Sequence, residues 1–236
     1  MKMEKITIPS HKDLFIRKIQ EAILSGDMPI GSRVPPEREL AEGMGVSRTV
    51  VNAGINVLVS QGFLTVVPRQ GTFVADYRSE GTLQTLDAIL KLKGDILSDR
   101  DVKSILEFRW AIEHLTMKNA VEKGTEEEIA RMQKIVDELK EAKTPGQAAN
   151  LCYQFQRNLA SIGGNEILGM IIVSFREPIL ALWQRFCRRY GIITLHEHTK
   201  RSLDFIIARD YEGAMKWLDL TINEAINGDY TVYSER

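Results

Sequence analysis

Residues 34–74 constrain the fold of this chain more than any other stretch. Residues 37–44 have the pattern of a short helix, because Pro36 suits a first helical turn and acidic side chains favour its start. A glycine-containing turn ends that helix, and Ser47 is placed to cap a second helix beginning at Arg48. Two short helices joined by a tight turn are typical of a helix-turn-helix.

A hairpin is predicted directly after this pair of helices. Residues 63–67 and 72–75 are strand-like, with a turn at Pro68, Arg69, Gln70 and Gly71 between them. Glycine accepts a positive φ, so the tip can approach a phosphate backbone or a minor groove closely. The order of elements therefore indicates a winged helix-turn-helix, and a hairpin that only closes a small core is the alternative.

The start of the second helix carries side chains suited to DNA recognition. Arginine bonds guanine or phosphate, asparagine pairs with adenine through two hydrogen bonds, and hydroxyl groups hold phosphates. We therefore expect DNA contacts from Ser47, Arg48, Thr49 and Asn52.

The first part of the chain resembles the DNA-binding domain of the GntR family of bacterial transcription regulators. The resemblance is carried by residues 31–41, 45–51, 61–64 and 69–74, in that order. It implies that Arg38 and Arg48 contact the operator and that Thr49 contacts its backbone. It also implies that the wing tip, which contains Arg69, Gln70 and Gly71, lies near the minor groove.

One departure from the family pattern concerns the middle of the second helix. The family continues this helix with an Arg-Glu pair, whereas Asn52, Ala53 and Gly54 stand here. Asn52 is therefore where we expect this protein's own operator preference. Gly54 is also unfavourable inside a helix, by about 1 kcal/mol relative to alanine.

The remainder of the chain has helical periodicity and no run of alternating strands. We expect a mainly α chain with two domains: a winged helix-turn-helix with a small β hairpin in residues 1–77, and an all-α bundle of about seven helices in residues 78–236. The expected helices cover residues 83–92, 102–123, 146–162, 166–175, 178–190, 192–209 and 212–227, and another starts at Thr125 with Glu128 in capping-box position.

This second part resembles the effector-binding and dimerisation (FCD) domain of the FadR subfamily of GntR regulators. The resemblance is carried by residues 106–109, 112–113, 155–165 and 206–210, and the helix expected at 83–92 favours the same group. Many members hold a divalent metal here through one Asp and three His. The matching positions are Cys152, Gln156, Thr199 and Thr221. Amide and hydroxyl groups are poor metal ligands, so we predict no metal and no other cofactor. An atypical site formed by Cys152, His196 and His198 is the alternative.

An anionic effector in a bundle without a metal must be held by cationic or hydrogen-bonding side chains. Arg109 interrupts an apolar stretch in mid-helix and is the leading candidate, with Gln156, Thr199 and Thr221 lining a polar cavity around it. The effector would be an organic acid or an acyl-CoA. Alternatively, Arg109 forms a buried ion pair with Glu113.

Bulk composition sets weaker limits. A net charge of -1 excludes a protein that is basic overall, but a local basic face suffices for DNA. No apolar run is long enough for a membrane span, residues 1–10 lack a secretory signal, and the two cysteines show no disulfide or metal spacing. We therefore expect a cytoplasmic protein without a membrane partner.

These observations predict a transcription regulator, as a repressor that binds a palindromic double-stranded DNA operator as a homodimer. A small-molecule effector is expected to control it. A constitutive DNA-binding protein whose bundle only dimerises is the first alternative. A metabolite-binding protein or enzyme is more remote, because no nucleophile and base are placed together by a motif.

Overall fold

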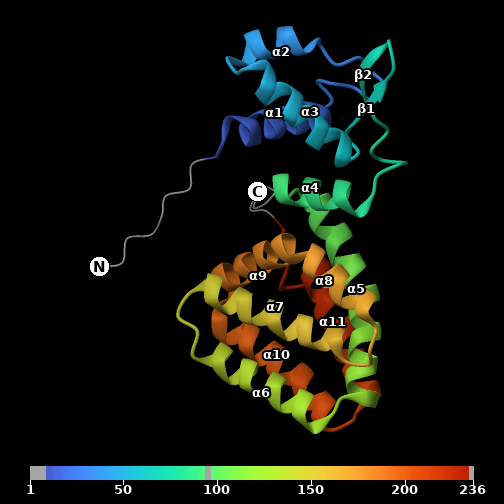
Figure 1. Cartoon of the computed structure of the whole chain (residues 1–236). Helices are drawn as coiled ribbons and strands as arrows, with labels where there is room; N and C mark the ends of the chain where they lie inside the picture. The colour runs from blue at the N-terminus through green and yellow to red at the C-terminus, as the bar shows by residue number, and fades with distance from the viewer. Residues whose placement is uncertain (1–8, 94–96, 234–236) are drawn as a thin grey trace. The chain divides into compact units, whose positions relative to one another are not determined.

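The computed structural model describes residues 9–93 and 97–233, which are largely helical apart from one hairpin (Figure 1). Contacts divide the chain into two units, Met1–Leu92 and Lys93–Arg236, and each unit has its own hydrophobic core. The elements of the first unit are α1 (His11–Ser25), α2 (Glu37–Met44), α3 (Arg48–Ser60), β1 (Leu64–Val67), β2 (Gly71–Val74) and α4 (Leu83–Lys93).

Helices α1, α2 and α3 begin and end where local signals place them. Ser10 caps α1 in a capping box with Asp13, and Gly26 ends the helix in the left-handed conformation. Gly45 ends α2 in the same conformation, and the Ser47 side chain accepts a hydrogen bond from the Val50 amide at the start of α3. The expected helix-turn-helix is confirmed in this part of the chain.

Gly54 lies where α3 packs closely on α1. A Cβ at this position would lie 2.7 Å from Cε1 of Phe15, a core side chain that is only 2% exposed. The unfavourable helix propensity of glycine is therefore offset by the close approach of two helices, which a larger residue would prevent.

Strands β1 and β2 form the expected antiparallel hairpin, with Leu64 opposite Val74 and Val67 opposite Gly71. Arg33 adds an isolated bridge to Phe73, so the segment before α2 lies along the outer strand. The turn uses left-handed backbone at Arg69 (φ 63°), and Gly71 has φ 122° with the Arg33 side chain against it.

Helix α4 belongs to the first unit by its packing, since Ala88 is buried in the same core as Phe15 and Ile89 packs against that core. The division of the chain therefore lies after α4, whereas the sequence led us to expect it at residues 77–78. The periodicity of residues 83–92 identifies a helix but does not say which core its apolar face covers.

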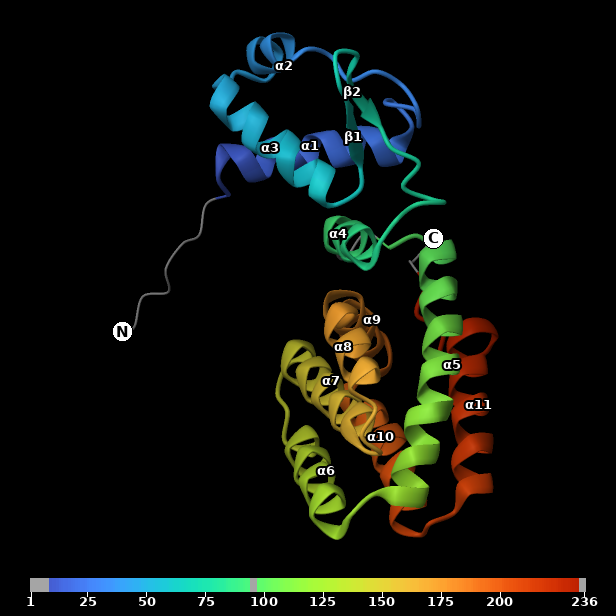
Figure 2. The same cartoon turned by 45° about the vertical axis from the view of Figure 1, so that its right-hand side comes forward.

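The second unit is a bundle whose described residues form seven helices. These are α5 (Asp99–Lys123), α6 (Glu126–Lys140), α7 (Pro145–Ser161), α8 (Glu166–Ser174), α9 (Arg176–Tyr190), α10 (Ile192–Ile207) and α11 (Tyr211–Asn227). Helix α7 packs against α6, α8 and α9, while α5 runs alongside α11, and α10 contacts α6, α9 and α11 (Figure 2). Within the described ranges, no helix is long and apolar enough to cross a bilayer.

Candidate functional site

Two regions of the molecule carry the residues singled out from the sequence. The first is the outer edge of α2, α3 and the wing. The side chains of Arg38, Ser47, Arg48, Thr49, Asn52, Arg69 and Gln70 are all exposed there, and Gly71 is half-buried.

The α3 side chains separate into two faces with different neighbours. Val51, Ile55 and Leu58 are buried in the core. Arg48 and Asn52 are exposed, because the helical repeat turns them away from that core. The structure therefore presents the polar start of α3 to solvent as a continuous edge.

Asn52 and Arg38 are both held by neighbouring side chains. Asn52 Nδ2 donates a hydrogen bond of 3.2 Å to Glu37 Oε1 of α2, and Asn52 Oδ1 accepts one from Asn56 Nδ2. Arg38 Nε donates to Glu42 Oε1 at 2.8 Å. These are exposed pairs of small energetic value, so each cation or amide can exchange its partner for a nucleic acid at little cost.

The second region is a cavity of about 70 Å³ inside the bundle. The structure brings together Arg109, Gln156, Thr199 and Thr221, which all line this cavity although they come from four helices. A smaller hollow of about 40 Å³ beside it shares Arg109, Trp183, His198 and Thr221.

Arg109 is paired inside this cavity. Its Nε and Nη2 atoms each lie 2.7 Å from Glu113 Oε1, and the two side chains are only 9% and 14% exposed. The guanidinium also lies 4.6 Å from the ring centre of Trp183. The ion pair considered from the sequence is therefore present, and it stands in the wall of the candidate pocket.

Two buried polar atoms at the cavity have no hydrogen-bond partner in the described chain. Gln156 donates from Nε2 to Glu113 Oε1 at 2.7 Å, but its Oε1 atom is unsatisfied. The indole Nε1 of Trp183 is unsatisfied as well. An unsatisfied buried polar atom is costly, so a ligand that supplies one donor and one acceptor would stabilise this arrangement. Sequence reasoning missed Trp183, since nothing in the local pattern distinguishes it from a core tryptophan.

The four positions that match the family's metal ligands do not form a set that fits a divalent cation. Cys152 Sγ lies 3.4 Å from Thr199 Oγ1, which donates its own hydrogen bond to the Leu195 carbonyl at 2.8 Å. Burial raises the pKa of the Cys152 thiol to about 12, so the thiolate that a metal requires is strongly disfavoured. Thr221 donates to the Leu218 carbonyl at 3.1 Å.

The alternative ligand set is not assembled either. His198 lines the cavity and packs edge-on against Trp217. His196 does not line this cavity, and the charged side chains that affect its pKa lie on α6 and on its own helix α10. Burial lowers the pKa of His198, which favours the neutral form of its ring. No cluster of three metal-ligating side chains occurs in residues 9–93 and 97–233.

Comparisons with known proteins match both units. The family model described as "Bacterial regulatory proteins, gntR family" matches residues 15–74, and the model described as "FCD domain" matches residues 104–223. The chain is 25% identical over 195 residues to the HTH-type transcriptional regulator LutR of Bacillus subtilis, covering 79% of this chain and 86% of that protein.

A second relative is the fatty acid metabolism regulator protein of Shewanella pealeana, 30% identical over 173 residues, which are 73% of this chain and 69% of that protein. These relatives are transcription regulators and not enzymes. A solved structure reported as "Lar controls the expression of the Listeria monocytogenes agr system and mediates virulence" has a TM-score of 0.65 at 14% identity, over 94% of this chain and 97% of that chain, and supports the fold alone.

Proposed function

This chain belongs to the gntR family of bacterial regulatory proteins and carries an FCD domain, and on that premise we propose that it is a cytoplasmic repressor that binds a palindromic operator as a homodimer. Family membership makes it a DNA-binding transcription regulator. Two-fold symmetry supplies one α3 helix to each half-site, about one turn of DNA apart. Effector binding in the bundle would change the relative placement of the two DNA-reading domains and lower the operator affinity.

The observation that supports the DNA contacts is the exposed polar edge of α3 beside the wing. Arg48 stands at the first position of this helix, and it is exposed. We expect Arg48→Ala to weaken binding to the DNA upstream of the protein's own gene by about tenfold or more, because one base or phosphate contact is lost in each half-site.

A matched control is Arg131→Ala in α6. Arg131 is an exposed arginine that pairs with Glu127 one helical turn away, as Arg38 pairs with Glu42. Its removal should leave the DNA affinity unchanged in an electrophoretic mobility or anisotropy titration. Unchanged affinity in Arg48→Ala would contradict the assignment of α3 as the recognition helix.

The cavity around Arg109 is the proposed effector site. We favour a small organic acid over an acyl-CoA, because a space of about 70 Å³ has room for only a few water-sized groups. Since Glu113 uses the Nε and Nη2 edge of the guanidinium, the remaining N–H groups of Arg109 can donate to an effector oxygen. Gln156, Thr199 and Thr221 would complete the polar lining.

Trp183→Phe is the sharpest test of this site, because it deletes the unsatisfied N–H and keeps an aromatic ring over Arg109. An organic acid that acts as effector should raise the melting temperature of the wild-type chain and release it from DNA. In Trp183→Phe the same acid should give a smaller rise in melting temperature and release less DNA. Unchanged DNA binding without acid is the control. A full response in Trp183→Phe would contradict the role of the indole.

We also propose that the cavity works without a metal. The supporting observation is the donor set, since Cys152 and Thr199 are hydrogen-bonded to each other and Gln156 donates to Glu113. Elemental analysis of the purified protein is the test. Stoichiometric zinc that survives dialysis would contradict the proposal.

A constitutive DNA-binding protein with a purely dimerising bundle is the second candidate. The Arg109–Glu113 ion pair favours this candidate, because the two charged side chains of the cavity neutralise each other without a ligand. This alternative becomes preferred if no organic acid changes either the melting temperature or the DNA affinity.

A further inference from the structure

Helix α8 is the most unusual surface of the bundle. Leu168 and Ile172 are its only buried side chains in the described structure, although six of its nine residues are large and apolar or methionine. Ile167, Met170 and Val173 are 67%, 64% and 48% exposed. Contiguous exposed apolar side chains of this kind mark a surface that is covered by a partner.

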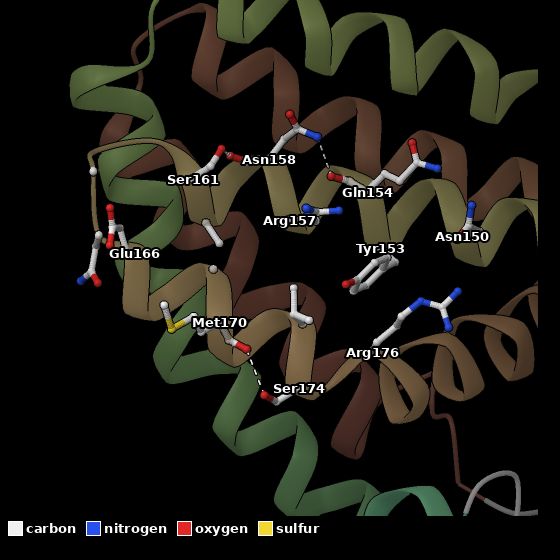
Figure 3. Close-up of a pocket in the computed structure, with 15 residues that line it drawn as sticks. Asn150, Tyr153, Gln154, Arg157, Asn158, Ser161, Glu166, Met170, Ser174 and Arg176 are labelled. Carbon is white, nitrogen blue, oxygen red and sulfur yellow. Dashed lines mark hydrogen bonds between the residues drawn. The ribbon is translucent and has the colours of Figure 1, made fainter. Parts of the chain in front are cut away.

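A groove runs beside these side chains, between α7 and α8 (Figure 3). Its volume is about 1150 Å³, which exceeds the usual size of a small-molecule pocket. Met170 and Val173 of α8 line one side, and Tyr153 and Arg157 of α7 line the other. A wide groove beside a raised apolar helix suits a protein surface better than a small ligand.

Two polar side chains that line the groove, Tyr153 and Arg157, have no hydrogen-bond or ion-pair partner within the described chain. Tyr153 is only 6% exposed, and the Arg176 guanidinium lies 5.6 Å from the centre of its ring, but its hydroxyl makes no hydrogen bond to any described residue. Arg157 is exposed and forms no ion pair with any described residue. Arg176, by contrast, is held by Glu177 at 2.6 Å. The groove therefore offers an unused hydroxyl and an unused cation.

The charges of the groove are arranged along its length. Glu166 lies at one end, Arg157 lies farther along, and Met170 lies between them (Figure 3). A two-fold axis that passed close to Met170 would bring the acidic end of one copy to Arg157 of the other, which would make the surface complementary to itself.

We propose that α8 and this groove form the isologous interface with a second copy of the chain. Glu166 of one copy pairs with Arg157 of the other, and the α8 side chains of both copies pack together around Met170. The inference rests on the homodimer of the proposed function and assigns the surface that forms it.

The test measures the dimer dissociation constant of the full chain by sedimentation velocity over a range of concentrations. Met170→Arg places a charge in the centre of the interface and should raise this constant at least ~30-fold, as expected at an interface hot spot. The matched control is Leu220→Arg in α11, because Leu220 is also apolar and 50% exposed but lies on a different helix. The control variant should remain dimeric. Circular dichroism of each variant checks that the helices are retained.

A charge exchange tests the pairing directly. Arg157→Glu and Glu166→Arg should each weaken the dimer through repulsion, and the double variant should restore it, because each copy then carries the reversed pair. A double variant weaker than both single variants would overturn the pairing.

The outcomes separate this inference from the proposal on which it rests. A wild-type chain that is monomeric with and without DNA would contradict the homodimer itself. A dimeric wild type whose dimer survives Met170→Arg, or dissociates in Leu220→Arg, would overturn only the assignment of α8 and the groove.

Discussion

The Arg109–Glu113 pair allows a quantitative prediction about the bundle. Glu113 Oε1 accepts one hydrogen bond from Arg109 Nε and one from Gln156 Nε2, each 2.7 Å long, and Arg109 Nη2 lies at the same distance in the ion pair. Because the paired side chains are only 9% and 14% exposed, water compensates little for the loss of either. Arg109→Met leaves a buried carboxylate with one remaining donor. We expect it to lower the free energy of unfolding by about 3–5 kcal/mol.

The double variant distinguishes this cause from simple loss of packing. Arg109→Met with Glu113→Met removes both charges, and its free energy of unfolding should lie within about 2 kcal/mol of the wild-type value, because replacing a buried pair by apolar groups is often nearly neutral. The coupling energy between the two sites should therefore be at least about 2 kcal/mol.

Urea unfolding followed by tryptophan fluorescence measures this coupling. The chain has three tryptophans, and Trp110, Trp183 and Trp217 all lie in the second unit, so the signal reports the bundle alone. Since Trp183 stacks on Arg109, the transition is followed in parallel by circular dichroism. Additive losses in the double variant would refute the view that the charges are stabilised by each other.

Further predictions concern the core, pH dependence, thiol chemistry and operator choice. Gly54→Ala should destabilise the first unit by up to about 2 kcal/mol in thermal unfolding, because overpacking against Phe15 outweighs the helix propensity gained; Phe15→Leu should make the same change favourable. Burial holds the pKa of His198 below its ordinary value of about 6.5, so the unfolded chain binds more protons than the folded chain in acid. The free energy of unfolding should therefore fall as the pH drops below about 6.5. His198→Gln should make this pH dependence weaker, and His196, whose pKa is also lowered, accounts for part of the dependence that remains. Burial raises the pKa of Cys152 to about 12, and a thiol reagent at pH 8 should label it only after urea unfolding; rapid labelling of the folded chain would contradict its burial. Asn52→Arg should change which operator bases are preferred in a binding selection, and an unaltered preference would remove Asn52 from the reading edge.

The parts of the fold that were predicted correctly depend on local chemistry. Ser47 and Thr125 cap helices because a side-chain oxygen reaches an amide three residues later, and this can be predicted from a few neighbouring residues. The position of the wing turn was predicted in the same way from residues 68–71, although Arg69 supplies its left-handed backbone and Gly71 begins β2.

The features that sequence reasoning missed depend on contacts between distant segments. Gly54 is explained only by Phe15, which lies two helices earlier, in α1. Helix α4 belongs to the first unit because Ala88 is buried in the core of that unit. In the cavity, Arg109 could be selected as an unusual residue, but the unsatisfied indole of Trp183 becomes visible only when α5 and α9 are placed together.

The two faces of α3 imply that folding and target choice can evolve separately in this protein. Val51 is fully buried, whereas its neighbour Asn52 is exposed and forms hydrogen bonds with the exposed side chains of Glu37 and Asn56. Substitution of Val51 is constrained by the packing of the core, whereas substitution of Asn52 is nearly free of that constraint. A lineage of such regulators could therefore acquire new binding sites in a genome through changes at Asn52 and nearby exposed positions without first losing a stable domain.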